Sequence, residues 1–308
     1  MKKAALIIPY FGNFPEWINL YLYSCKKNPE IDFIFFTDSS LENTPPNLLT
    51  DVNNITINHI SFEDYCRLAS EELNIEFKPE NAYKLCDLRP WYGIIHEDIL
   101  KNYEYWGYGD IDLVYGDLTS FLRSFYRKKK DVFSTHSDRV SGHFCLLKNN
   151  SYYRNLAFEI PNWKELLLSE KHHGVDEGHF STIILKRQRY FRAIIYRLTK
   201  KYLLRQKLLT IVNKVIFRNM MLSELYTSPK PSNGMAWSYE TSTGTVTDMR
   251  SGTQLPYLHF LFFKKTVWWK ENENYWKDGF YRVNSLEPAI KITIDNQGIA
   301  KEKMPELQ

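Results

Sequence analysis

Short apolar runs alternate with segments of helical spacing through the first third of the chain, and this alternation constrains the fold most. Residues 4–9 and 31–37 are nearly continuous apolar runs that predict buried strands, and residues 16–25 between them carry apolar side chains at helical spacing. Residues 55–60 and 62–73 repeat the order of strand and helix. Because such connections place helices on the faces of a sheet, the pattern predicts an α/β fold with a mostly parallel sheet covered by helices.

Composition supports a globular chain and excludes several classes. The chain has 308 residues, of which 44% are hydrophobic and 25% charged, so it can bury a sizeable core, and disorder, collagen and coiled coil are excluded. The four cysteines lack the close pairs of a zinc ribbon or redox dithiol, which indicates a reduced, cytosolic chain. The N-terminal apolar run stops at Pro9, too early for a signal peptide, and no run approaches the ~20 apolar residues that span a bilayer.

The later segments are expected to continue the fold and then change character. We expect a helix or helix end around Pro90, and an irregular, turn-rich region beyond Ser223. Further expected elements are strands at residues 105–112, 132–134 and 143–147 and helices at 90–100 and 162–169. Since ligands of parallel sheets bind beyond the carboxyl ends of the strands, residues 10–13 and 37–38 are the first places to search for a site.

Asp110 and Asp112 lie one residue apart after an apolar run and between glycines. Two carboxylates at this spacing can converge on one divalent cation, which would keep open positions for diphosphate oxygens and stabilise the charge of a departing nucleoside diphosphate. The alternative is a solvated acidic turn, which is the ordinary interpretation of an isolated Asp-x-Asp. The preceding strand and the flanking glycines favour the cation site here.

Three stretches resemble the GT-A glycosyltransferases, specifically the small bacterial enzymes of capsule and lipopolysaccharide synthesis. They occur in that family's order and together span about residues 4 to 185. The first is Leu-Ile-Ile-Pro-Tyr-Phe-Gly-Asn-Phe-Pro-Glu-Trp with the later Phe-Phe-Thr-Asp; the second is Tyr-Lys-Leu-Cys-Asp-Leu-Arg-Pro (83–90) followed by residues 106–112; the third is Ser-Gly-His-Phe (141–144) with Asp-Glu at 176–177.

This resemblance implies a set of donor-binding and metal-binding residues. Tyr10, Phe11 and Asp38 would contact the uracil or ribose of a UDP-sugar, and Asp110 and Asp112 would bind Mn²⁺ or Mg²⁺, with Asp110 also near the sugar hydroxyls. The donor side would also include Lys84, Asp87 and Arg89; Lys84 and Asp87 can share a helical face, where they would present a cation to the phosphate and a carboxylate to the sugar hydroxyls. The alternative for these last residues is a surface ion pair at a helix start.

The resemblance extends to His259 and Lys264. In that family a late histidine completes the metal sphere and a lysine about five residues on meets the diphosphate; imidazole is an acceptable ligand for Mn²⁺. A histidine in an aromatic strand is otherwise a hydrogen-bonded core residue. The sequence also departs from the family's glycine and Lys-Pro-Trp ending.

Asp176 and Glu177 resemble the family's acidic pair beside the anomeric carbon, where one of them would deprotonate the acceptor hydroxyl or orient the sugar. Gly142 and His143 would lie on the acceptor side. For Asp176 a compatible alternative is an N-cap for a helix over residues 178–185. The neighbouring histidines also permit a metal site, although no second ligand set of recognisable spacing accompanies them.

Basic residues are concentrated between Lys186 and Arg218, where 11 Lys and Arg occur without Asp or Glu, against 29 basic and 36 acidic residues elsewhere. Apolar residues recur there at helical spacing, so we expect one or two cationic amphipathic helices that dock on the anionic inner face of the plasma membrane. The alternative is a helix packed on the domain with a solvated basic face. Nucleic acid is not expected as a partner because no recognition motif accompanies the charge.

The expectation is therefore a cytoplasmic, peripherally bound enzyme with three regions: a GT-A, Rossmann-like nucleotide-sugar-binding and catalytic core over residues 1–185, a basic helical segment over 186–222, and a C-terminal region over 223–308 that completes the site. It would transfer a hexose from a UDP-sugar to a glycan or lipid-linked glycan. The alternatives are a nucleotidyltransferase or sugar-nucleotide hydrolase on a similar fold, and a non-catalytic, membrane-associated glycan-binding protein.

Overall fold

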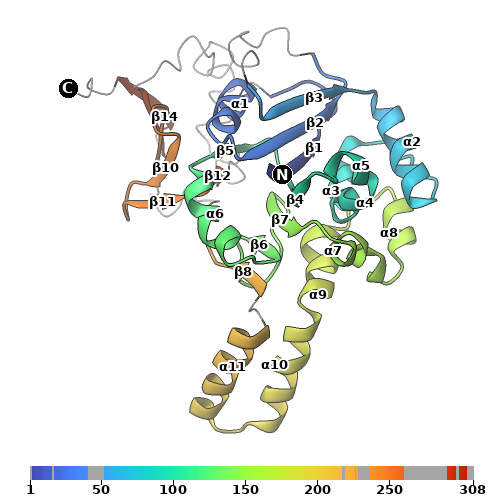
Figure 1. The fold of residues 1–308 in the computed structure, drawn as a ribbon, viewed down its shortest axis with the longest axis vertical. Coiled ribbons are helices and arrows are strands. Elements are labelled where there is room, and N and C mark those ends of the chain that lie inside the picture. Colours follow the sequence, from blue (N-terminus) through green and yellow to red (C-terminus); the bar gives the residue numbers. More distant parts are fainter. Residues whose placement is uncertain are drawn as a thin grey trace. The chain divides into compact units, whose positions relative to one another are not determined.

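The computed structural model describes residues 2–15, 17–40, 52–216, 219–225, 227, 236–259, 290–295 and 298–303, and these form an α/β architecture (Figure 1). Parallel pairs in its central sheet are β2 with β3, β1 with β4 and β6 with β8, while β7 runs antiparallel to both β4 and β6. The mostly parallel α/β fold expected from the sequence is confirmed. The strand order is β3 (Ile55–His59), β2 (Ile31–Thr37), β1 (Lys2–Pro9), β4 (Tyr103–Gly109), β7 (Phe144–Lys148), β6 (Val132–Ser134) and β8 (Met220–Leu222).

The chain divides into two compact units, and β1 contributes residues to both. The first unit comprises residues 1–7, 62–109 and 125–224, and the second comprises residues 8–61, 110–124 and 225–308. The helix α6 (Leu118–Arg127) also contributes residues to both.

The first unit contains strands β4, β6, β7 and β8 and most of the helices. Its core includes Trp106, which is fully buried on β4. Gly107 beside it allows the close approach of β7, because a β-carbon there would lie 1.9 Å from the carbonyl oxygen of Cys145. The helices are α2 (Phe62–Leu73), α3 (Leu85–Leu88), α4 (Tyr92–Ile95), α5 (Glu97–Leu100), α7 (Ser151–Asn155), α8 (Trp163–Leu168), α9 (Ser181–Ile184), α10 (Lys186–Leu198) and α11 (Tyr202–Ile216), with short 3-10 turns at Ala82–Lys84, Arg89–Trp91 and Leu156–Glu159 and a π-helical turn at Asp176–Phe180.

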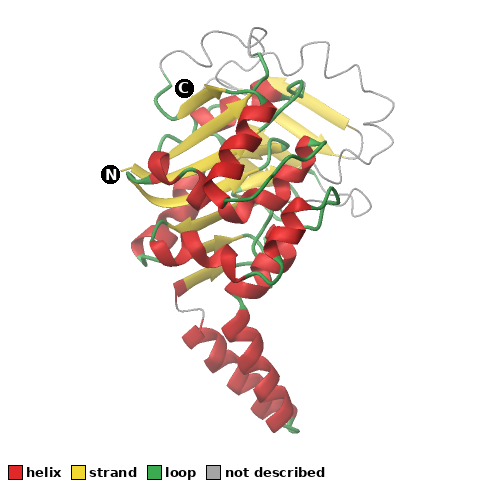
Figure 2. Cartoon of the chain, turned by 90° about the vertical axis from the view of Figure 1, so that its right-hand side faces the viewer, coloured by secondary structure: helices red, strands yellow, loops and turns green. Residues whose placement is uncertain are grey.

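Pro90 lies within a run of short helical turns, so it is neither the start nor the end of one long helix: α3 precedes it and α4 follows it. Two helices, α10 and α11, form the basic segment; they contact each other and lie side by side in both views (Figures 1 and 2). The two-helix form of the expectation is confirmed. Among the helices of the described residues, none is both long and apolar enough to cross a bilayer.

The second unit contains α1 (Ile18–Lys26), the pair β2–β3 and two antiparallel sheets. The smaller sheet joins β5 (Leu113–Tyr115) to β12 (Tyr257–His259). The larger has the order β11 (Thr253–Leu255), β10 (Thr245–Asp248), β9 (Trp237–Glu240), β13 (Ile290–Asp295) and β14 (Gly298–Lys303). The turn-rich region expected beyond Ser223 therefore includes antiparallel strands.

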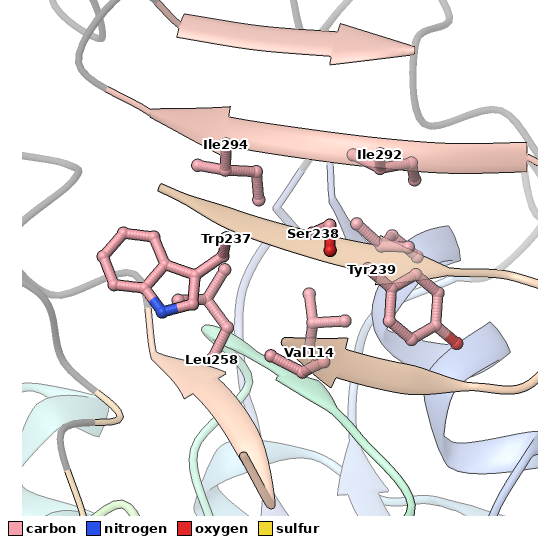
Figure 3. Close-up of a pocket in the computed structure, with 9 residues that line it drawn as sticks. Val114, Trp237, Ser238, Tyr239, Leu258, Ile292 and Ile294 are labelled. Carbon is pink, nitrogen blue, oxygen red and sulfur yellow. The ribbon is translucent and has the colours of Figure 1, made fainter. Parts of the chain in front are cut away.

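Apolar side chains fill the space between these two sheets. Val114 of β5 and Leu258 of β12 are partners in the register, and both face side chains of β9 and β13 such as Trp237 and Ile292 (Figure 3). All four are buried. This packing fixes β12 against β5 and so sets the position of the residue that ends β12, His259.

Candidate functional site

Asp110, Asp112 and His259 meet in the second unit. One ligand atom from each residue lies within 4.8 Å of the others, and the imidazole Nε2 of His259 is 3.5 Å from Oδ1 of Asp112. The side chain of His259 is 6% exposed and that of Asp112 is 15% exposed. The histidine is therefore buried, as its aromatic surroundings predict, and its Nε2 also faces the carboxylate of Asp112.

Strand pairing explains why residues so distant in sequence meet. The antiparallel register places His259 opposite Leu113, the residue after Asp112, and the backbone N–H of His259 donates to the carbonyl of Thr227 at 2.8 Å. The strand expected over residues 105–112 ends at Gly109, so both aspartates lie in the turn between β4 and β5. Their convergence comes from this turn and not from the alternation of a strand.

Trp17 is a residue of this site that the sequence did not single out. Its indole N–H donates to the carbonyl of Ile111 at 2.8 Å, and the residue as a whole is only 8% exposed. Since Ile111 lies between the two aspartates, this bond fixes the backbone that carries them. The sequence signal was weak, because Trp17 occurs at the start of a helix where an aromatic residue usually serves packing.

The loops after β1 and β2 are tied together in the same unit. The backbone N–H of Gly12 donates to Oδ1 of Asp38 at 3.0 Å, and the hydroxyl of Ser39 donates to the carbonyl of Gly12. Gly12 has a φ of 92°, a left-handed conformation that favours glycine. The carboxylate of Asp38, expected to contact a ribose, thus also shapes the loop that carries Tyr10 and Phe11.

Tyr10 connects this loop to the aspartate cluster. Its ring stacks on that of Phe14 with centroids 5.2 Å apart, and its hydroxyl donates to the carbonyl of Asn13 at 2.9 Å. Burial raises the pKa of the Tyr10 phenol, and the charge of Asp112 raises it further. Residues expected to bind base, ribose and metal therefore occur together in one unit.

Two carboxylates and one imidazole are a donor set that suits Mn²⁺. Hard carboxylate oxygens are also the ligands that Mg²⁺ accepts, whereas the imidazole favours transition metals over Ca²⁺. The residues present therefore fit the expected divalent cation.

The acidic pair lies in the first unit, on the π-helical turn. Oδ2 of Asp176 is 2.7 Å from the guanidinium of Arg89, and Oε1 of Glu177 accepts the backbone N–H of Gly142 at 2.9 Å. A β-carbon on Gly142 would lie 2.8 Å from Oδ2 of Asp176, so only glycine fits against this pair without displacement. The structure thus joins Arg89, Gly142 and both acids, all predicted from sequence, and His143 follows directly.

Asp176 does not act as the N-cap considered for a helix over residues 178–185. It already lies within the π-helical turn, and its Oδ1 accepts the N–H of the adjacent Glu177 at 2.8 Å, whereas a cap accepts from the second or third residue of the helix. Its carboxylate is oriented by Arg89 instead.

Lys84 and Asp87 form a buried ion pair, so the interpretation as a surface pair was wrong. Nζ of Lys84 is 3.0 Å from Oδ2 of Asp87, their side chains are 2% and 0% exposed, and Nζ also donates to the carbonyls of Leu166 and Lys171 at 2.7 Å each. Three acceptors match the three N–H groups of the ammonium. This geometry makes Lys84 a structural residue and speaks against the expected contact with a diphosphate.

Asp87 organises the segment that leads to the acidic pair. Burial raises the pKa of Asp87, but backbone N–H groups of Val175 and His173 and the ammonium of Lys84 outweigh it, so the pKa is lowered overall. The carboxylate therefore anchors the backbone immediately before Asp176. This role differs from the sugar contact expected from sequence.

Lys264, expected to meet the diphosphate, lies outside the described residues. Among the residues that are described, two groups of metal-ligand side chains come together: the aspartate cluster with His259, and a group of His136, His143 and Glu177 in the first unit.

Fold and cluster together define an α/β protein with an Asp-x-Asp turn and a histidine on a paired strand. The chain belongs to the family described as a family of unknown function, DUF6625, whose model matches residues 6–281. No curated protein matches the sequence.

Distant likenesses connect the chain to solved glycosyltransferase structures. The PaToxG glycosyltransferase is 14% identical, with 70% of this chain and 86% of that chain covered and a TM-score of 0.39. Mouse xyloside xylosyltransferase 1 in its apo form is 10% identical, with 71% and 84% covered and a TM-score of 0.33. The galactosyltransferase LgtC, in complex with donor and acceptor sugar analogues, is 12% identical, with 56% and 72% covered and a TM-score of 0.31.

Proposed function

We propose that the protein is a metal-dependent glycosyltransferase that moves a hexose from a UDP-sugar to a hydroxyl of a surface glycan of the capsule or lipopolysaccharide kind. The observation that carries this proposal is the meeting of Asp110, Asp112 and His259 within 4.8 Å, with the histidine buried and both aspartates partly buried. A solvated acidic turn needs no buried imidazole, whereas a cation site uses one as its third ligand.

Each residue of the second unit has a defined task in this proposal. Asp110, Asp112 and His259 would hold a Mn²⁺ or Mg²⁺ ion, whose charge stabilises the diphosphate that departs when the glycosidic bond of the donor breaks. Tyr10, stacked on Phe14, offers a ring against the uracil, with Phe11 beside it in the same loop, and Asp38 accepts a ribose hydroxyl. Lys264 remains a proposed ligand of the diphosphate.

In the first unit, Glu177 is proposed to accept the proton of the acceptor hydroxyl and Asp176 to orient the sugar. Arg89 holds Asp176 at 2.7 Å, and the N–H of Gly142 holds Glu177 at 2.9 Å, so both carboxylates have fixed orientations before any substrate binds. His143 is proposed to contact the acceptor.

The test measures UDP release from UDP-sugars with Mn²⁺ and a glycan acceptor. Asp112→Asn should lower turnover at least ~100-fold, the order expected when one electrostatic contact to a leaving group is lost. Asp98→Asn, which changes the charge of an exposed residue on α5, is the matched control and should behave as the wild type. Unchanged turnover in Asp112→Asn would refute the proposal. UDP-sugar cleavage that no acceptor accelerates would favour a hydrolase, and formation of a sugar nucleotide from a triphosphate would favour a nucleotidyltransferase.

We also propose that the protein docks peripherally on an anionic cytoplasmic membrane surface through residues 186–218. Large apolar side chains are exposed where α10 and α11 meet, since Leu198, Tyr202 and Leu203 are 76%, 68% and 82% exposed, and Lys200 and Lys201 between them are also exposed. Apolar groups flanked by cations match the boundary between acyl chains and anionic headgroups.

Co-sedimentation with lipid vesicles tests the docking. We expect binding to vesicles that contain anionic lipid, weak binding to zwitterionic ones, and loss of binding in Leu203→Ser. Leu168→Ser, which alters an exposed leucine of α8, is the control. Equal binding of Leu203→Ser and the wild type would contradict the proposal, and vesicle binding without metal-dependent affinity for UDP would favour a non-catalytic glycan-binding protein.

A further inference from the structure

His136, His143 and Glu177 form the second group of converging ligand atoms, and these atoms also lie within 4.8 Å of one another. His136 follows β6, His143 precedes β7 and Glu177 lies on the π-helical turn, so all three belong to the first unit. The two imidazole rings are 5.6 Å apart between centroids and nearly perpendicular, at 87°. His143 is 6% exposed and the side chain of His136 is 13% exposed, whereas that of Glu177 is 42% exposed, so two buried or nearly buried imidazoles face a carboxylate that solvent can reach.

Glu224 orients the ring of His136. Its Oε1 is 3.3 Å from Nδ1 of the imidazole, and its Oε2 accepts the backbone N–H and the hydroxyl of Ser137 at 3.2 and 3.3 Å. A carboxylate at Nδ1 assigns the proton to that nitrogen and leaves the lone pair on Nε2. This is the arrangement in which an outer carboxylate holds a histidine for metal binding.

The guanidinium of Arg139 lies against two of the three candidate ligands. Its Nη2 is 3.2 Å from Nε2 of His136, and its Nε is 3.7 Å from Oε2 of Glu177. A cation, the guanidinium of Arg139, therefore already lies between Nε2 of His136 and the carboxylate of Glu177. The side chain of Arg139 is 37% exposed, so it can move into solvent and vacate this position.

We propose that His136, His143 and Glu177 bind a divalent transition metal such as Zn²⁺, and that the guanidinium of Arg139 competes with the metal. Two imidazoles and one carboxylate are a donor set that zinc and cobalt accept, with a fourth position open to water or a ligand. The aspartate cluster has one imidazole and two carboxylates, so the two groups differ in the metals they prefer. This inference does not rest on the proposed glycosyltransferase activity, although it uses two residues of the proposed acceptor side: a metal bound to Glu177 and His143 would block their roles there.

Co²⁺ provides a spectroscopic probe, since it occupies zinc sites and absorbs visible light intensely when four-coordinate. Full-length protein titrated with Co²⁺ should develop such a band, and competition with Zn²⁺ gives the affinity. His143→Ala and Glu177→Gln should each weaken binding at least ~100-fold, and Glu224→Gln about 10- to 100-fold, the range for outer-shell partners. Asp112→Asn should leave the band unchanged, which separates this group from the aspartate cluster.

Arg139→Met gives the most specific outcome. Removal of the competing cation should tighten Zn²⁺ binding several-fold, whereas a merely structural Arg139 would give weaker binding or none. His179→Ala, which removes an exposed histidine nearby in sequence, is the matched control and should bind as the wild type. Thermal melts without metal identify any variant that fails to fold. A band that survives both His143→Ala and Glu177→Gln, or weaker binding in folded Arg139→Met, would overturn the proposal.

Discussion

Replacing Lys84 by methionine should destabilise the protein by about 3–5 kcal/mol, the range for breaking a buried ion pair by removing one partner. The pair is completely enclosed, with 2% and 0% exposure and a separation of 3.0 Å between Nζ and Oδ2 of Asp87. Methionine keeps the volume of the stem, so the loss is electrostatic and not a cavity. Backbone N–H groups of Val175 and His173 still solvate the carboxylate, so we expect the lower part of the range.

Thermal melting and chemical denaturation measure this loss. At about 2 °C per kcal/mol, the lower end for large domains, a loss of about 3–4 kcal/mol should lower the melting temperature by about 6–8 °C. Lys78→Met is the matched control: Lys78 lies 2.8 Å from Glu76, but both side chains are more than three-quarters exposed, so this change should leave the melting temperature within experimental error.

Two results would refute the reasoning. One is equal melting temperatures for Lys84→Met and Lys78→Met, because burial would then not matter. The other is strict additivity in the double variant Lys84→Met/Asp87→Asn, because partners in a buried pair must couple. The stability of the protein at acid pH gives an independent check. Because the pKa of Asp87 is lowered in the folded state, its contribution to stability is present at neutral pH and is lost as the pH falls through that pKa. Lys84→Met should move this loss to higher pH.

Further predictions concern pH, packing and metal. Burial lowers the pKa of His96 to about 3, and the hydroxyl of Tyr65 lies 2.9 Å from its Nε2. Below about pH 6.5 the unfolded state therefore binds a proton that the folded state does not, so the free energy of unfolding should fall by about 1.4 kcal/mol for each unit by which the pH is lowered. His96→Gln should flatten this slope in urea titrations. Gly142→Ala should cost about 1–3 kcal/mol and reduce turnover, because its β-carbon would displace Asp176, whereas Gly178→Ala meets nothing within 4 Å and should retain activity in the same assay. Chelation with EDTA should abolish UDP release, and Mn²⁺ should restore it; activity that persists after chelation would contradict the metal's role.

Local sequence patterns were sufficient for much of the fold. The strands Ile31–Thr37 and Val132–Ser134 and the helix Phe62–Leu73 have the expected bounds, because continuous apolar runs and helical spacing determine elements that are buried on known faces. The strand before Asp110 was expected to be longer than it is. Its end at Gly109 depends on the Trp17 bond and the strand pairing around the turn, which no local pattern contains.

For the candidate site, residue types were predictable but partnerships were not. Arg89 and Asp176 were both named from sequence, yet their contact at 2.7 Å depends on how the first unit folds. Burial changed the interpretation of Lys84, since an i, i+3 pair has the same sequence signature on a surface and in a core. Likewise, nothing in the spacing of His136, His143 and Glu177 indicated that they converge.

The pairing of β12 with β5 has a consequence for biosynthesis. His259 reaches Asp112 only after β12 has been translated and paired, so a nascent chain cannot assemble the three-ligand cluster while earlier segments are emerging from the ribosome. Assembly of the three-residue cluster therefore waits until the chain has been synthesised through β12 and that strand has paired with β5.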